Sequence, residues 1–497
     1  MRLIFAIGLV AALVAALGVV SARTWTDAST GKQIEAEFEG TSDGKVKLKR
    51  SDGRSFEVPL ERLSAEDQTY VEAQMATESA VAEAGGVVAS SAAVGAEVGG
   101  ADWPTWRGVN RDDHSPDTGL LSSWPDDGPE LLWTFENAGK GYSSPVIVGG
   151  RYYVTGSRDG KAEVICLDAG TGEEVWAAEI GEDPEDGYNT GWGAGTRGTP
   201  TVDGGMIYAI DANGHMVCLN LEDGKQEWSV DLVEDFGGKV PNWGYSESPL
   251  VDGDQVVVTP GGKDGAIVAL DKTTGKVKWR SEGLEDDAQY SSLVPADVNG
   301  KRQYIQLFMN TLAGVDASSG EVLWSSEWAP GRTAVIPTPI YTNGQVFLTS
   351  GYGAGCKLVQ IDGEEAEDVW QNTEMKNHHG GVVLVDGYVY GFSDGGGLVC
   401  LNLESGELEW NEKGRDVQKG AVHYADGMLY CVDENEGMVL LVEASPDGYE
   451  EKGKFKLPKE TELREGTKGK IWSHPVVIGG KLYLRDNDLV FCYDVGG

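Results

Sequence analysis

The stretch VICLDAGTGEEVW, Val164 to Trp176, decides the fold, because variants of it recur along most of the chain. Four apolar residues run into a turn made of Asp, Ala, Gly and Thr, and a second short segment ends at the tryptophan. Glycine and aspartate accept the positive φ angles that tight hairpin turns require. The stretch therefore predicts two antiparallel strands joined by a tight turn.

Copies of this hairpin recur with a regular period. Before each hairpin, a stretch such as SSPVIVGGRYYV adds two more short strands around a turn. Six copies end at tryptophans that lie 52, 51, 45, 46 and 40 residues apart. A degenerate seventh copy runs from about Gly420 to Phe455, and an eighth begins at SHPVVIGG. A period of about 40–50 residues with four strands in each unit is typical of a β-propeller. We therefore predict an all-β fold, with an eight-bladed β-propeller over residues 101–497. The terminal tryptophans are Trp176, Trp228, Trp279, Trp324, Trp370 and Trp410.

The eighth copy lacks its fourth strand, because the chain ends soon after FCYDV. The segment ELLWTF, around Trp133, precedes the first complete copy and has the character of the missing strand. Pairing these two ends would close the ring and remove the exposed strand edges. We therefore expect the N-terminal strand of the propeller to complete its last blade.

The chain before the propeller differs in composition. Residues 1–22 hold an early arginine, a long apolar run and the small residues Val20-Ser21-Ala22, which predicts a signal peptide or, if uncleaved, an N-terminal anchor. No second apolar segment of that length follows, so we expect a periplasmic or secreted chain without a stable membrane span after cleavage. Residues 74–100 contain no aromatic residue and are mostly Ala, Gly, Ser, Val and Glu, which predicts a flexible linker.

Residues 23–73 form a separate small module. The segments IEAEFEG, KVKLKR and SFEVPL read as short strands between glycine turns, and Ser64 followed by Asp67 predicts a helix cap. These segments, with VPLERLSAEDQTYV, resemble the SLA-type homology domain, a small SH3-like barrel. The resemblance implies a module that binds short peptide motifs. A structural or wall-tethering barrel is the alternative.

The turns CLDAGTGEEVW, ALDKTTGKVKW and GVDASSGEVLW resemble the repeats of pyrroloquinoline quinone (PQQ) propellers, over about residues 103–497. In that family the tryptophan packs between blades. The opening DWPTWRGVNRDDHSPDTGLLSSWP resembles members of the superfamily from bacterial envelopes. Some of these are quinoprotein dehydrogenases, and others are likened to a scaffold of outer-membrane protein assembly, so the resemblance implies one of these two roles.

The charge of the chain is strongly acidic, with 80 Asp and Glu against 40 Lys and Arg and a net charge of −40. Nucleic-acid binding requires basic patches that displace counterions from phosphates, so we exclude it. Anionic membrane surfaces are disfavoured for the same reason. The acidic surface indicates a solubilising role or, alternatively, docking of cations or basic partners.

Aligning the copies on their first strand places a set of residues just before that strand. The first strand of a propeller blade is innermost, so these residues should surround the mouth of the central channel, where ligands bind. Their mixture of aromatic, cationic and hydrogen-bonding groups suits a small anionic or aromatic ligand, or a side chain of a protein partner. A water-filled channel whose polar residues bond to one another is the alternative. The predicted ligand-binding residues are Tyr142, Arg197, Tyr245, Glu247, Gln289, Tyr290, His378, His379, Lys419, Trp472 and His474.

The adjacent histidines His378 and His379 raise the question of a metal site. Neighbouring residues of a strand point to opposite faces, so we expect that the two rings do not share one ion. Glu247, His379 and His474 are the set that comes closest to a site, and a metal would need further ligands at about 2.0–2.2 Å. We predict no metal site.

The PQQ enzymes carry a disulfide between adjacent cysteines, Glu and Asn ligands to calcium, and an Asp base. The chain has six cysteines but no adjacent pair, and no matching set of acidic and amide residues can be placed. We therefore predict no catalytic residue and no cofactor, PQQ with calcium included. The cysteines should be mostly buried free thiols, although a bridge involving Cys356 and Cys431 stays open.

These observations predict an exported, non-catalytic propeller that binds a protein or ligand in the cell envelope, with a peptide-binding module in front. We expect a monomer. Two alternatives stay open: a divergent PQQ-dependent quinoprotein dehydrogenase, and an accessory protein that binds envelope polysaccharide.

Overall fold

The computed structural model divides the chain into two compact units, Met1–Ala92 and Ala93–Gly497. The predicted signal peptide and the predicted linker lie outside the described residues. No helix among the described residues has the length and apolarity needed to cross a membrane. The structure describes residues 102–497 apart from 184–186, 329–332, 416 and 465–468, together with residues 23–26, 32–42, 45–50, 54–59, 62–64, 67 and 71.

The N-terminal unit contains an antiparallel four-stranded sheet in chain order. Its core holds Trp25, Val46 and Leu48, with Leu63 and Val71 packed on them. The Asp67 amide donates to the Ser64 hydroxyl at 3.2 Å, which is the predicted cap. The strands are β1 (Arg23–Thr26), β2 (Gln33–Ser42), β3 (Lys45–Lys49) and β4 (Ser55–Pro59).

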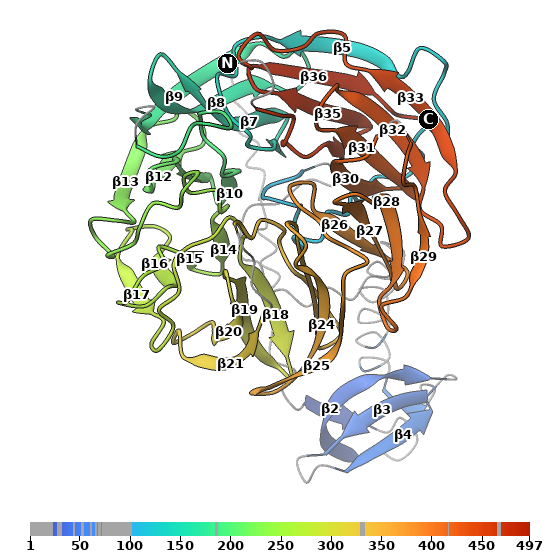
Figure 1. Cartoon of the computed structure of the whole chain (residues 1–497). Helices are drawn as coiled ribbons and strands as arrows, with labels where there is room; N and C mark the ends of the chain where they lie inside the picture. The colour runs from blue at the N-terminus through green and yellow to red at the C-terminus, as the bar shows by residue number, and fades with distance from the viewer. Residues whose placement is uncertain are drawn as a thin grey trace, which may run out of the picture. The chain divides into compact units, whose positions relative to one another are not determined.

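The second unit is the predicted eight-bladed propeller (Figure 1). Seven of its blades are four-stranded antiparallel sheets that follow the chain order from β6 to β33. The central strands of each blade are almost entirely buried, whereas the outermost strands alternate between buried and exposed residues, as expected for sheets stacked around an axis. The first four blades are β6–β9 (Val146–Val148, Arg151–Arg158, Lys161–Asp168, Glu174–Glu182), β10–β13 (Thr201–Asp203, Met206–Ile210, His215–Asn220, Gln226–Asp231), β14–β17 (Leu250–Asp252, Gln255–Val258, Val268–Asp271, Val277–Arg280) and β18–β21 (Val294–Val298, Lys301–Leu307, Thr311–Asp316, Val322–Glu327). The next three are β22–β25 (Ile340–Thr342, Gln345–Ser350, Gly355–Asp362, Glu365–Asn372), β26–β29 (Val382–Val385, Tyr388–Ser393, Gly397–Asn402, Leu408–Asn411) and β30–β33 (Gly420–Ala425, Met428–Asp433, Met438–Glu443, Glu451–Lys456).

The last blade closes the ring as predicted. It consists of β34 (Val476–Ile478), β35 (Lys481–Asp486), β36 (Leu489–Asp494) and β5 (Glu130–Phe135). Strand β5 lies beside β36 at the outer edge of the blade, and Trp133 is opposite Cys492 in the register (Figure 1). Because both ends of the propeller share one sheet, opening the ring would break β-ladder hydrogen bonds.

The terminal tryptophans join neighbouring blades. The Trp133 indole donates to the carbonyl of Ala169 in the next blade at 3.2 Å, and its ring lies against Gly172. A Cβ atom on Gly172 would lie 2.5 Å from that ring, so only glycine leaves room for it. The same packing recurs for Trp228 on Gly275. Trp324 departs from it, because its indole donates to Gln303 of its own blade at 2.7 Å.

All six cysteines are free and buried. The bridge left open for Cys356 and Cys431 does not form. The Cys356 thiol instead lies 3.1 Å from the side-chain oxygen of Asn372.

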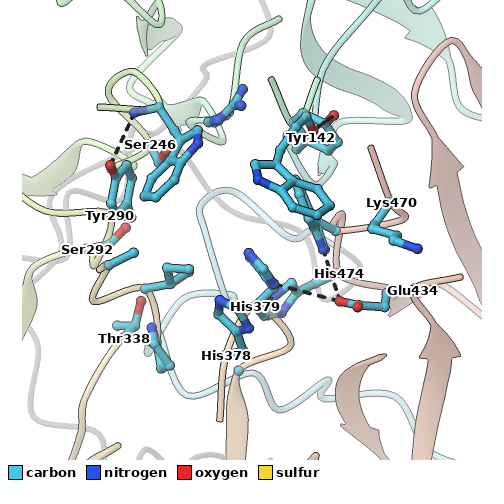
Figure 2. Close-up of a pocket in the computed structure, with 18 of the residues that line it drawn as sticks. Tyr142, Ser246, Tyr290, Ser292, Thr338, His378, His379, Glu434, Lys470 and His474 are labelled. Atoms are coloured by element: carbon cyan, nitrogen blue, oxygen red, sulfur yellow. Dashed lines mark hydrogen bonds and ion pairs between the residues drawn. The ribbon is translucent and has the colours of Figure 1, made fainter. Parts of the chain in front are cut away.

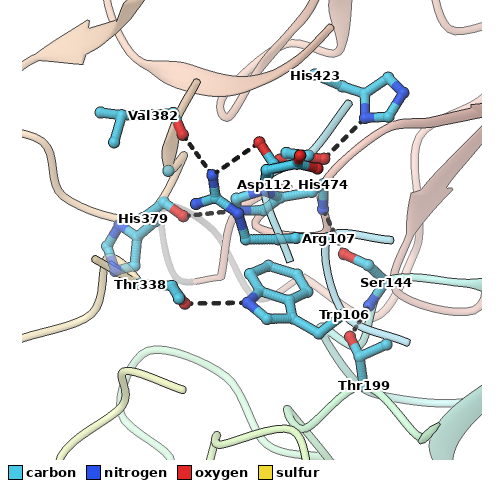
Figure 3. Close-up of polar contacts among 12 residues, drawn as sticks. Trp106, Arg107, Asp112, Ser144, Thr199, Thr338, His379, Val382, His423 and His474 are labelled. Atoms are coloured by element: carbon cyan, nitrogen blue, oxygen red, sulfur yellow. Dashed lines mark hydrogen bonds and ion pairs between the residues drawn. The ribbon is translucent and has the colours of Figure 1, made fainter. Parts of the chain in front are cut away.

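The segment from Asp102 to Asp117, here called the hub segment, lies at the centre of the ring, where it contacts the inner ends of the blades. Figure 3 shows its residues Trp106, Arg107 and Asp112 among their polar contacts. Its residues Arg107, Arg111 and Asp113 have φ angles of 63°, 56° and 66°, a conformation that non-glycine residues rarely adopt. All three side chains are buried. A compact, irregular segment of this kind needs partners from the surrounding blades to hold it.

The hub segment finds such partners in every blade. Two arginines donate to backbone carbonyls at the inner ends of blades, and polar side chains bind the others. The segment therefore ties the eight blades to one another at their centre, in addition to the closure at the rim. From the first blade to the last, the contacts are Trp103 with Ile147, Thr105 with Thr201, Arg111 with Pro249 and Leu293, Trp106 with Thr338, Arg107 with Val382, Asp113 with His423, and Asp117 with Gly480.

Candidate functional site

A cavity of about 650 Å³ opens at the centre of the propeller, and we call it the funnel (Figure 2). Its wall is formed by the loops that lead into the innermost strands, because these loops end next to the ring axis. Its size is in the range of small-ligand and peptide-binding pockets. Eight of the eleven predicted residues line it: Tyr142, Arg197, Tyr290, His378, His379, Lys419, Trp472 and His474.

One side of the funnel is a continuous row of rings. The centroids of Tyr142 and Trp472 are 5.0 Å apart, and Trp472 stacks on His379 at 4.3 Å. His379 stacks on His378 at 3.9 Å, and His378 meets the edge of Tyr352 at 4.2 Å. Two of these contacts are nearly parallel, with interplanar angles of 20° and 23°. The row therefore offers flat, polarisable surface to a bound group.

The two histidines contradict the expectation that their rings point to opposite faces. They lie in the loop before β26, which begins at Val382, and not in a strand. The alternation of faces applies only to extended strand backbone. In this loop both rings turn toward the funnel and stack.

The funnel is positively charged although the chain as a whole is acidic. Among the residues described on either side of 329–332 and 465–468, its lining holds Arg197, Lys419 and Lys470 and one carboxylate, Glu434. The Lys419 ammonium lies 3.0 Å from Asp394, and the Trp472 indole donates to Glu434 at 3.0 Å. Positive charge collected in a cavity with apolar walls attracts anions strongly, because low-dielectric walls focus the field.

Arg197 is held rigidly at the funnel wall. Its guanidinium donates to the carbonyls of Gly195 and Gly193 at 2.8 and 3.0 Å. It also lies over the rings of Tyr142 and Tyr188, at 4.9 and 5.6 Å from their centroids. Among the residues that the structure describes, no carboxylate forms an ion pair with it.

Burial and these cations keep both histidines neutral. Burial, followed by the neighbouring His379 and Lys419, lowers the pKa of His378 to about 3. Burial, followed by the charges of Lys419 and Arg197, holds the pKa of His379 well below its usual value. Charging an imidazole here would place a cation among cations in a dry site. At neutral pH the histidines therefore act as hydrogen-bonding and stacking groups.

Three predicted residues lie outside the funnel wall, which corrects their placement. Tyr245 is buried, and its hydroxyl donates to the carbonyl of Pro260 at 2.9 Å. Glu247 is buried with one oxygen accepting from the Thr259 amide at 2.6 Å, and burial raises its pKa to about 7. Gln289 donates to the carbonyl of Ala288 at 3.0 Å. The loops that carry these side chains bend before the strand and turn the side chains between blades. Alignment of the repeats on their first strand does not reveal such bends.

The structure also adds residues to the funnel that the sequence did not single out. Trp106 of the hub segment lines the cavity, and its indole donates to Thr338 at 3.0 Å (Figure 3). His474 meets the Trp106 ring edge-on, with centroids 4.7 Å apart, and donates to the carbonyl of His379 at 2.9 Å. The many polar and aromatic residues around Trp106 were the signal available in the sequence. This segment is not part of a repeat, however, so the repeat alignment does not place it in the ring. The further additions are Trp192, Trp243, Tyr352, Glu434 and Lys470.

The residues present do not fit PQQ with calcium. The disulfide of adjacent cysteines that the PQQ enzymes place over the cofactor cannot form, because all six thiols are buried in separate strands. Calcium prefers six to eight oxygen ligands, and the described part of the funnel lining offers one carboxylate beside three cations. Among the described residues, no cluster of three His, Cys, Asp or Glu side chains is arranged to hold a metal ion.

Comparison with known families matches both units. The model described as outer membrane protein assembly factor BamB matches residues 83–187, 160–412 and 357–445, together more than half of the chain. The SLA1 homology domain 1, SHD1, matches residues 19–79.

Individual relatives of this chain are named outer membrane protein assembly factor BamB. The outer membrane protein assembly factor BamB of Burkholderia pseudomallei is 25% identical over 308 residues, which cover 54% of this chain and 76% of the relative. That of Kangiella koreensis is 28% identical over 214 residues, 43% of this chain, and this match spans only 49% of the relative. The crystal structure of BamB from Moraxella catarrhalis has a TM-score of 0.52 at 16% identity, over 73% of this chain and 97% of that one, which shows a shared fold.

The four-stranded blades, their closure by an N-terminal strand and the match over residues 83–445 agree with one another. This chain belongs to the β-propeller family described as outer membrane protein assembly factor BamB, with an SLA1 homology domain 1 in front of the propeller.

Proposed function

We propose that this protein is an exported, non-catalytic scaffold of the cell envelope that holds partner proteins through the propeller funnel. The relatives named for outer membrane protein assembly support a role in that process. The chemistry of the funnel supports binding without catalysis. Its histidines are neutral and stacked, and the Glu434 carboxylate is engaged by an indole, so no group in the described part of the funnel is set up as a nucleophile with its base.

The observation that carries the proposal is the composition of the funnel wall. Aromatic side chains and arginine, which dominate the energetics of protein interfaces, are concentrated there around a concave site. Two of the aromatic residues, Trp192 and Tyr352, are 50% and 41% exposed. Large exposed aromatic side chains at the rim of a cavity are typical of recognition sites.

The N-terminal module adds a second contact in this proposal. Its match to SLA1 homology domain 1 supports binding of a short peptide motif. Two modules on one chain would raise the apparent affinity for a partner that reaches both, because the second contact forms within one complex. Export to the periplasm or to the exterior, and a monomeric state, belong to the same proposal.

Site-specific photo-crosslinking in the native envelope tests the role of the funnel. A photo-reactive phenylalanine analogue replaces Tyr352 at the funnel rim in one variant and Val277, 50% exposed on the outer strand β17, in a matched control. We expect discrete adducts with one or a few envelope proteins from position 352, identified by mass spectrometry. Adducts that are absent at 352, or the same at both positions, would show that partners do not dock at the funnel.

A further inference from the structure

We propose that the funnel binds a carboxylate of an acidic peptide segment of the partner between Arg197 and Lys419, with a neighbouring flat side chain against the row of rings that contains Trp472. This inference rests on the proposed function and names the chemistry of the segment that docks. Four observations support it.

The first observation is the charge contrast. The chain carries a net charge of −40, so its surface repels acidic segments in general. The described part of the funnel lining reverses that sign, with three cations against one carboxylate, although Asp394 pairs with Lys419 beside it. An acidic segment is therefore repelled by the rest of the molecule and attracted at this one cavity, which provides specificity by both attraction and repulsion.

The second observation is that the two cations converge from different blades. Arg197 precedes β10 and Lys419 precedes β30, far apart in the chain. Arg197 lies over the Tyr142 ring at one end of the row of rings, and the Lys419 ammonium lies against His378 Nδ1 near the other end, so the two cations flank His379 in one cavity. A carboxylate placed beside His379 would meet positive charge from both sides, and the planar guanidinium of Arg197 can bind it through two N–H groups.

The third observation is a set of unused polar atoms in the funnel wall. His378 Nε2, His379 Nδ1 and Trp243 Nε1 are buried and have no hydrogen-bond partner among the described residues, and the nearest carboxylate to His379 Nδ1, that of Glu434, lies 3.7 Å away (Figure 2). Buried polar atoms normally have a partner, in the protein, in water or in a ligand. The indole N–H can only donate, and a neutral imidazole can donate from one nitrogen, so a ligand rich in acceptor oxygens suits these groups.

The fourth observation is backbone strain at the rim. Tyr352 has a φ of 56°, which is costly for a bulky residue, and its amide donates to Asp394 at 3.3 Å. This conformation holds the Tyr352 ring against His378, at the end of the row. Asp394 also pairs with Lys419, so one carboxylate positions both an aromatic wall residue and a cation.

Isothermal titration calorimetry on the full chain tests the inference with three acetylated and amidated tripeptides. Their sequences are Glu-Trp-Glu, Gln-Trp-Gln and Lys-Trp-Lys, which share the ring and differ in charge. We expect the acidic peptide to bind at least about tenfold more tightly than the glutamine peptide. Arg197→Gln and Lys419→Gln should each weaken that binding by about tenfold or more, whereas Lys225→Gln, an exposed lysine of the second blade, should leave it unchanged.

Equal binding of the acidic and glutamine peptides would overturn the inference. So would loss of the acidic peptide's binding in the Lys225→Gln control, since attraction would then be diffuse. Benzene-1,3,5-tricarboxylate serves as a separate arm. If it binds with the same dependence on Arg197 and Lys419 while no peptide does, the site takes small aromatic acids and the peptide inference is wrong. If crosslinking at position 352 succeeds but neither the acidic peptide nor benzene-1,3,5-tricarboxylate binds, the proposed scaffold role is retained and the inference of an acidic ligand is wrong.

Discussion

The hub segment makes a prediction that can be worked out in energetic terms. Asp113 is 2% exposed, and one of its oxygens lies 2.7 Å from His423 Nδ1. The other ring nitrogen of His423 accepts the Val477 amide, so the imidazole proton is on Nδ1 and is donated to Asp113. Burial raises the pKa of the Asp113 carboxyl, but its contacts with His423 and His474, joined by the charge of the buried Arg107 guanidinium, hold that pKa well below its usual value.

The substitution Asp113→Asn isolates this charge. Asparagine has nearly the same shape, tolerates the φ of 66°, and its carbonyl oxygen can still accept from His423. What is lost is the carboxylate that neutralises Arg107. Removing a buried charge that compensates another costs up to about 3–5 kcal/mol, and we take about 3 kcal/mol because Asp113 acts on Arg107 through its charge, without a direct ion pair among the described residues, and Asp112 acts on it as well.

This free energy converts into a measurable shift of the melting temperature. Unfolding entropy is about 2.1 cal/mol/K per residue, or about 0.8 kcal/mol/K for a ring of roughly 400 residues. A loss of about 3 kcal/mol should therefore lower the Tm of the propeller by about 4 °C at pH 7.5. Differential scanning fluorimetry of the tryptophan signal measures this directly.

The matched control is Asp223→Asn, the same chemical change at a carboxylate that is 43% exposed and paired with Lys225. Exposed ion pairs contribute about 0–1 kcal/mol, so the control should shift the Tm by about 1 °C or less. If Asp113→Asn melts within 1 °C of the control variant, the view that the hub segment ties the ring together through a buried charge is refuted.

Three further predictions concern the blades and the funnel. Trp279→Ala should destabilise the propeller by about 3–5 kcal/mol, seen as a lower Tm, because the ring and its bond to the next blade are both lost. A Tm within 1 °C of the wild type would argue against docking between blades. The pKa of His378 is lowered in the folded state, so its stabilising contribution is complete above about pH 6.5 and is lost as the pH falls toward 3. Between pH 7 and pH 5 the wild type should lose about 2 kcal/mol more than the single variant His378→Gln in urea unfolding, and parallel losses would contradict this. Gly193→Ala should weaken the binding of the acidic tripeptide and also lower the Tm, because a Cβ atom there would lie 1.8 Å from the Tyr142 hydroxyl and because alanine disfavours the φ of 110° at this position; unchanged affinity would contradict the placement of that ring.

Most of the propeller could be predicted from the sequence because its strands and turns are determined by residues close together in the chain. The tight turn of the hairpin, as after Cys166, needs glycine, and the terminal tryptophan recurs because most blades present a glycine of this turn to the tryptophan of the preceding blade. The closing strand around Trp133 could also be predicted, since an incomplete last blade leaves an edge that must be paired. Eight of the funnel residues followed from one rule, that the first strand of each blade lies nearest the axis.

Other features depended on loop conformation. Whether Tyr245 and Glu247 face the funnel or pack between blades is decided by bends before β14, which no periodicity encodes. The stacking of His378 on His379 likewise required a loop in place of the expected strand. In both cases the side-chain direction follows from backbone angles that are set by tertiary contacts.

The sequence by itself determined the number of blades, their order and the residues that border the axis. Only the tertiary structure decided that the hub segment lies at the centre, and that Arg197 and Lys419 flank His379 in one cavity. The reason is physical: strand pairing and tight turns depend on neighbours a few residues away, whereas the centre of a closed ring is built from one short piece of every blade. Which charges meet there depends on the angle at which each loop arrives, and that angle exists only once the ring has closed.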